Sequence, residues 1–125
     1  MCRLCNQDVA NLLHTFYNCK FIEDFWNSIA NWLTPVIFPY TVKLTCEHII
    51  FGMLPYTIGN HCINHCLMYC KLYIHINQTN KKIPMFKNFL KYYRDVLTLE
   101  ETLFIIRNEK NVFVKLFNKL NVLCQ

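Results

Sequence analysis

The first nineteen residues contain three cysteines and a histidine, Cys2, Cys5, His14 and Cys19, in the spacing C-x2-C-x8-H-x4-C. A C-x2-C pair can hold two thiolates on one ion, and zinc takes four sulfur and nitrogen ligands in a tetrahedron. His14 and Cys19 can complete that set if the helical segment between them ends at Asn18. A bound zinc ion would then contribute folding free energy to the N-terminal segment. The alternative is that these cysteines serve as small apolar residues.

The composition favours helices over other fold classes. The chain has 125 residues, of which 54% are hydrophobic and 15% aromatic, so a disordered chain is excluded. Two glycines and four prolines leave little material for a turn-rich β sandwich. The eight cysteines suggest thiols in a reducing compartment, because disulfide frameworks belong to secreted, loop-rich domains. Neither a signal peptide nor a membrane span is recognisable, so we expect an intracellular protein of the nucleus or cytoplasm.

The spacing of apolar residues predicts the individual helices. A first amphipathic helix is expected from Lys20 to Leu33, ended by Thr34-Pro35, with core-facing Phe21, Phe25, Trp26, Ile29 and Leu33. Further helices are expected at 45–51, at 58–76 with apolar residues nearly all round, from Pro84 to Leu97, from a capping box at Thr98–Glu101 to Asn108, and at 112–123. The fold class is therefore all-α, a small multi-helix domain with an N-terminal zinc knuckle. We divide it into residues 1–33, the knuckle and first helix, and 34–125, a helical tail with a basic C-terminal half.

The net charge of +5 lies in the C-terminal half of the chain. Residues 1–70 hold three basic and four acidic residues, whereas residues 71–125 hold ten basic and four acidic ones. The densest basic run consists of Lys81, Lys82, Lys87, Lys91 and Arg94, of which the last three share a helical face, and Tyr92 beside them could stack on a base. Arg107, Lys110, Lys115 and Lys119 could extend this patch. RNA or single-stranded DNA is a plausible partner, and an ordinary solvated helix face is the alternative.

A second group of histidines and cysteines lies in the predicted helix at 58–76. His61 and His65 are one helical turn apart, as are Cys62, Cys66 and Cys70, so each set shares a face that could chelate a metal. The simpler interpretation, which we favour, is that the cysteines fill a buried helix and the histidines have polar partners. A Cys/His nucleophile is less favoured, because no orienting acid or oxyanion pocket is recognisable nearby.

Several of these residues also carry a family resemblance. Cys2-Arg3-Leu4-Cys5, the run from Leu13 to Cys19, and Phe25-Trp26 resemble the zinc-binding, cysteine-rich C-terminal segment of non-LTR (LINE-type) retrotransposon reverse transcriptases. Weaker similarity continues through Leu44-Thr45, Ile50-Phe51-Gly52 and Tyr69–Ile74. The resemblance spans essentially the whole chain, but only about the first 26 residues carry a specific motif.

The resemblance implies a nucleic-acid-binding accessory to an enzyme that copies its own RNA. It assigns Cys2, Cys5, His14 and Cys19 to the four metal-ligand positions of the family. The acidic residue often found four positions before the histidine is Ala10 here, and no Tyr-x-Asp-Asp of a polymerase is present. We therefore expect a detached tail that is not an enzyme and that binds RNA or single-stranded DNA, with the reverse transcriptase as a further possible partner. The alternative is a helical module that docks onto a partner protein without touching nucleic acid.

Overall fold

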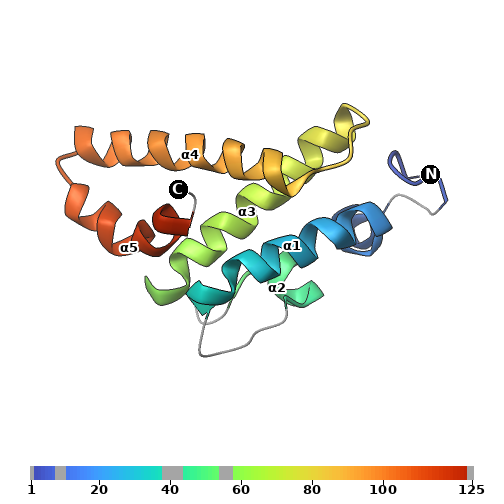
Figure 1. The fold of residues 1–125 in the computed structure, drawn as a ribbon, viewed down its shortest axis with the longest axis horizontal. Helices are drawn as coiled ribbons and strands as arrows, with labels where there is room; N and C mark the ends of the chain where they lie inside the picture. The colour runs from blue at the N-terminus through green and yellow to red at the C-terminus, as the bar shows by residue number, and fades with distance from the viewer. Residues whose placement is uncertain (1, 8–10, 38–43, 54–57, 124–125) are drawn as a thin grey trace.

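The computed structural model describes residues 2–7, 11–37, 44–53 and 58–123, and this part of the chain is all-α, with no strand. Its elements are a π-helical turn η1 (His14–Asn18) and the helices α1 (Lys20–Ile37), α2 (Cys46–Phe51), α3 (Ile58–Thr79), α4 (Phe86–Ile106) and α5 (Lys110–Leu123). In Figure 1, α1 and α4 lie on opposite sides, α3 crosses between them, and α5 turns back beneath α4. The predicted fold class is confirmed, including a Cys/His cluster near the N-terminus that could form a knuckle.

The core forms where α1, α3 and α4 meet. The ring of Phe25 lies 5.6 Å from that of Phe89 in an edge-to-face arrangement, and Phe89 stacks on Tyr93 at 5.5 Å between ring centroids. Aromatic pairs in these arrangements contribute beyond the apolar area they bury. Four of the five predicted core residues of α1 are buried, whereas Phe21 is only partly buried and Ile22 is fully buried. Phe21 packs against the edge of the core, and its ring also lies 5.1 Å from the Lys20 ammonium.

The end of α1 differs from the sequence prediction. Thr34-Pro35 does not end the helix, which continues to Ile37. A proline removes one backbone donor and crowds the carbonyl four residues earlier, so its effect is confined to one turn. The Thr34 hydroxyl donates to the carbonyl of Ala30 at 3.0 Å, which is compatible with a continuing helix. The proline therefore lies in the last turn of α1 and not beyond it.

Helix α4 is continuous across the predicted boundary at Thr98. The hydroxyl of Thr98 donates backwards to the carbonyl of Arg94 at 3.0 Å, and Thr102 does the same to Thr98. A capping threonine would instead accept a bond from a backbone N–H ahead of it. The predicted capping box was therefore wrong, because the motif occurs inside a helix whose apolar stripe extends through both halves. A true capping box starts α2, where Thr45 and His48 exchange side-chain and backbone bonds at 3.3 Å.

Helix α3 is the central element, but it is not buried all round. Cys66, Cys70 and Ile74 are fully buried, whereas Met68 and Leu72 on the opposite face are exposed. The all-round apolar pattern predicted that α3 is buried on every face, but the other helices cover only one side of it. Among the described helices, none combines the length and hydropathy needed to cross a bilayer.

Candidate metal centre and basic face

The four residues of the N-terminal motif converge on one point. Each of Cys2, Cys5, His14 and Cys19 offers one ligand atom, and these atoms all lie within 4.8 Å of one another. The Sγ atoms of Cys2 and Cys19 are 3.9 Å apart, and Sγ of Cys5 lies 3.3 Å from Nε2 of His14. A disulfide bond has an S–S length of about 2.05 Å, so Cys2 and Cys19 are not joined covalently. This cluster could hold a metal ion.

The local backbone explains how His14 and Cys19 meet. The amide of Cys19 donates to the carbonyl of His14 at 3.1 Å, five residues back, which is the π-helical bond. Cys19 itself has an extended backbone, with φ −62° and ψ 133°, so η1 ends at Asn18, which meets the condition for His14 and Cys19 to face the same point. Single π turns are common at functional sites because they realign a side chain by one position. Here the wider turn lets residues five apart face the same point.

Three neighbouring contacts hold this turn in place, and the sequence did not identify them. The side-chain oxygen of Asn11 accepts from the amide of His14 at 2.8 Å, as a helix-capping residue does. Gln78, at the end of α3, donates to the carbonyl of Thr15 at 2.8 Å, and the indole of Trp26 donates to the carbonyl of Phe16 at 2.6 Å. The position of Asn11, three residues before His14, was a usable capping signal. The other two contacts depend on packing between distant segments.

Two of the four candidate ligand side chains belong to the hydrophobic core. Cys2 and Cys19 are 2% and 0% exposed, respectively, and pack within the main buried cluster. Burial raises the pKa of the Cys19 thiol to about 11, and the neighbouring Cys2 thiol adds to that effect. Removing a thiol from water disfavours its charged form, but a bound cation reverses this preference. The centre is therefore protonated at Cys19 without a cation and suited to thiolate ligation with one.

In the second histidine and cysteine group, Cys62, Cys66 and Cys70 are buried in the core, as the favoured interpretation predicted. Burial raises the pKa of the Cys70 thiol well above its usual value, and its neighbour Cys66 contributes. Within the described residues, the N-terminal quartet is the one histidine, cysteine or acid group whose geometry could hold a metal.

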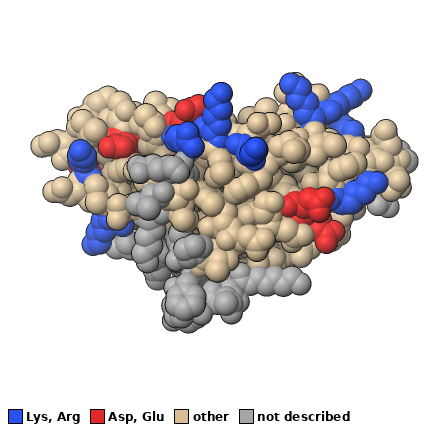
Figure 2. Space-filling view, in the orientation of Figure 1, with Lys and Arg blue, Asp and Glu red and all other residues tan. Residues whose placement is uncertain are grey.

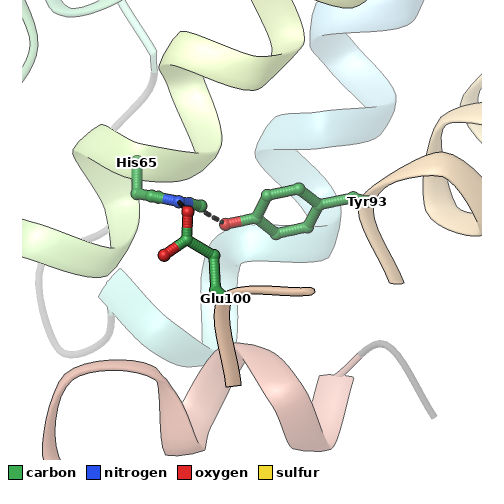
Figure 3. A network of polar contacts seen from close by, with 3 residues as sticks. All are labelled: His65, Tyr93 and Glu100. Carbon is green, nitrogen blue, oxygen red and sulfur yellow. Dashed lines mark hydrogen bonds and ion pairs between the residues drawn. The ribbon is translucent and has the colours of Figure 1, made fainter. Parts of the chain in front are cut away.

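His65 forms a polar contact at the junction of α3 and α4 (Figure 3). Its Nδ1 lies 2.8 Å from the hydroxyl of Tyr93, and its Nε2 lies 3.6 Å from Oε1 of Glu100. Among the described residues, Nε2 has no hydrogen-bond partner. Burial lowers the pKa of His65, although Glu100 opposes the shift. Because Tyr93 is fully buried, this contact joins α3 to α4 within the core.

The predicted nucleic-acid-binding residues lie on the surface. Lys81 and Lys82 are exposed in the turn after α3, and the remaining three, Lys87, Lys91 and Arg94, are exposed on α4. Figure 2 shows basic side chains along α4 and near the turn that precedes it. Tyr92 is only partly available, because it packs on Tyr73 with ring centroids 5.5 Å apart, and burial raises its pKa.

The residues that could extend the basic run lie further along the chain. Arg107, Lys110 and Lys115 are exposed at the end of α4 and along α5. The side chain of Lys119 lies outside the described part of the structure. Helix α5 packs against both α3 and α4.

Comparison of the chain with protein-family models, curated proteins and solved structures finds no match. The resemblance to the retrotransposon segment therefore rests on the quoted residues, and the function is argued from the site.

Proposed function

We propose that Cys2, Cys5, His14 and Cys19 bind a single zinc ion that organises the N-terminal segment. Zinc lies about 2.3 Å from sulfur and about 2.0 Å from imidazole nitrogen, so a tetrahedral site needs S–S separations of about 3.8 Å. The 3.9 Å between Cys2 and Cys19 and the 3.3 Å between Cys5 and His14 are close to such edges. Three thiolates and an imidazole are also the donors that structural zinc prefers. This convergence of all four ligand atoms is the observation that supports the metal assignment.

The zinc assignment is tested by metal analysis of protein purified under reducing conditions. We expect one equivalent of zinc, lost on replacing Cys5 or His14 with alanine. Cys46→Ala is the matched control, because Cys46 is partly buried like Cys5 but lies outside the cluster. Zinc retained by both cluster variants, or lost equally from the control, would contradict the assignment.

We further propose that the module binds RNA or single-stranded DNA as a non-enzymatic accessory of a retrotransposon reverse transcriptase. The supporting observation is that all five residues of the basic run are exposed and that three of them lie on one helix. Lysine and arginine side chains attract phosphates without reading the bases, so we expect binding that depends little on sequence. The zinc centre would act separately, by holding the N-terminal segment in place.

The test of nucleic-acid binding is a salt titration with a fluorescent single-stranded oligonucleotide. Replacing Lys87 and Lys91 with glutamine should weaken binding to all sequences and reduce the salt slope by about 0.7 per lost phosphate contact. The matched control compares the single replacements Lys20→Gln and Lys87→Gln, because each removes one positive charge from an exposed lysine and Lys20 lies on α1, outside the basic run and its possible extension. Equal effects of these two single variants would indicate general attraction to a positive protein. No effect of the double variant would exclude the basic run as the binding face.

A protein-docking module is the second candidate, favoured by the apolar surface of α4. Leu99, Leu103 and Ile106 follow helical spacing on α4 and are 63%, 41% and 74% exposed. A stripe of exposed large apolar residues is typical of surfaces that a partner covers. Apolar docking depends weakly on salt, so the same titration separates the two functions.

A further inference from the structure

A small cavity lies next to the turn that carries His14 and Cys19. Its volume is about 250 Å³, and one wall is the stripe Glu23, Trp26, Asn27 and Ala30 on the first half of α1. These positions follow the three-and-four spacing of one helix face. Tyr17 and Asn18 of η1 and Leu44 before α2 complete the lining. The described lining residues therefore come from η1, α1 and the residue before α2, and none of them is a proposed metal ligand or part of the basic run.

The chemistry of this cavity is acidic and aromatic. Glu23 contributes a carboxylate, and Asn18 and Asn27 contribute amides whose oxygens can accept hydrogen bonds. Trp26 offers its ring only, because its indole N–H is already bonded to the carbonyl of Phe16. Among the described lining residues there is no lysine, arginine or histidine, and Glu23 is the charged one.

We propose that this cavity binds the guanidinium group of an arginine side chain from a partner protein. A guanidinium is planar and carries five N–H donors, which match a carboxylate and nearby amide oxygens. It also packs favourably against the aromatic rings of Tyr17 and Trp26. The volume is below the range of about 300 to 1,000 Å³ typical of sites for whole small-molecule ligands, which suits the head group of one side chain.

The surrounding charge separates this site from the proposed nucleic-acid face. Asp24, the exposed neighbour of Glu23, adds a second carboxylate at the same part of α1. Figure 2 shows acidic side chains over the start of α1, next to a basic side chain and apart from the basic side chains along α4. A phosphate backbone would be repelled at the acidic surface, whereas an arginine would be attracted. The arginine site is therefore independent of the proposed nucleic-acid binding, and either can hold without the other.

The experiment titrates the full zinc-loaded chain with the blocked tripeptide acetyl-Gly-Arg-Gly-amide. Binding is followed by NMR shifts of the Trp26 indole and of the side-chain amides of Asn18 and Asn27. The same tripeptide with citrulline, which keeps the shape but is neutral, should bind about fivefold more weakly, the upper end for an ion pair with a solvent-exposed carboxylate. Glu23→Gln should weaken the arginine peptide by a similar factor. Glu23 is exposed, so this variant is expected to fold normally.

Asp24→Asn is the matched control, because Asp24 is exposed on the same turn but does not line the cavity. It should change the affinity by about twofold or less, as expected for a screened surface charge. Equal weakening by Asp24→Asn and Glu23→Gln would overturn the proposal in favour of a diffuse negative surface. It would also be overturned if the arginine peptide left the reporter signals unchanged, or if uncharged nucleosides shifted them more strongly.

Discussion

At the scale of single residues, Trp26 joins three parts of the molecule: the core, the turn η1 and the cavity beside α1. Its ring packs edge-to-face on Phe25 with centroids 5.6 Å apart, and its N–H bonds to the carbonyl of Phe16. The same residue lines the cavity beside Tyr17. The apolar spacing of α1 predicted its burial, but the hydrogen bond to η1 depends on a contact that spacing does not show.

Replacing Trp26 with alanine should lower the free energy of unfolding by roughly 3–5 kcal/mol, the usual range for a large buried aromatic residue. Trp26 is 4% exposed, so nearly all of its ring surface would be lost from the core. Urea denaturation followed by circular dichroism measures the change. Trp32→Ala is the comparison, because Trp32 is only partly buried, and it should cost less. A larger loss for Trp32 would contradict the packing described.

His65 should make stability depend on pH in the weakly acidic range. Burial lowers its pKa below the usual 6.5, so the unfolded chain takes up a proton at a higher pH than the folded chain. The free energy of unfolding should therefore fall as pH decreases through about 6.5, and this contribution should level off below the folded pKa. Urea midpoints measured at several pH values test this for the parent and for His65→Gln.

The His65→Gln comparison isolates this residue, because both proteins keep the N-terminal quartet and lose any bound metal in the same way. The difference between the two curves should be flat above about pH 7 and should change below it. Parallel curves across the whole range would show that His65 does not contribute to the pH dependence.

At the scale of elements, threonine gives two opposite outcomes in this chain. Thr45 accepts the amide of His48 and starts α2, whereas Thr98 donates backwards inside α4. Both precede acidic or polar residues in patterns that predict a helix start. A threonine caps a helix only if the residues before it are not themselves helical. The residues before Thr98 are already helical, because the aromatic stripe of α4 packs them into the core.

Alanine at these two threonines should therefore have opposite effects. Thr45→Ala should lower the free energy of unfolding by about 1 kcal/mol, since it removes a true N-cap. Thr98→Ala should leave stability unchanged or raise it by a few tenths of a kcal/mol, because alanine has a higher helix propensity than threonine. Equilibrium denaturation of both variants measures the difference. A clear loss at Thr98 would restore the interpretation of a helix boundary there.

The elements show which features the sequence could predict. The C-x2-C and H-x4-C pairs are short enough for local geometry to bring their partners together, so the candidate metal residues were predictable. The spacing of apolar residues is also a local feature of the sequence, and it predicted most of the helices. The exposed side of α3, the continuity of α4 and the cavity beside α1 depend on how distant helices pack, which local patterns do not specify. The basic run remains a prediction, since exposure alone does not show a ligand.

At the scale of the whole molecule, we expect the core formed by α1, α3 and α4 to persist without a metal. Ring contacts of Phe25 with Tyr73 and Phe89, and of Phe89 with Tyr93, join these helices through residues outside the N-terminal quartet. The quartet instead connects to this core through Cys2 and Cys19, and through the bond from Gln78 to Thr15.

Removal of zinc by a chelator under reducing conditions should therefore loosen residues 2–19 while the longer helices remain. Hydrogen exchange should accelerate at the amides of Asn6 and Cys19, which donate to the carbonyls of Cys2 and His14. Amides of α3 and α4 should keep most of their protection, and the circular dichroism signal should fall only slightly. Loss of helicity throughout the chain would show instead that the fold as a whole requires the metal.

The burial of Cys19 has a further consequence through mass action. Cys19 is 0% exposed and is also a proposed metal ligand. Folding and ion binding are therefore linked equilibria. If the folded chain alone binds zinc, each tenfold rise in free zinc above the dissociation constant adds about 1.4 kcal/mol to the apparent stability. The melting temperature of this protein would then be a property of the zinc buffer around it as much as of its sequence.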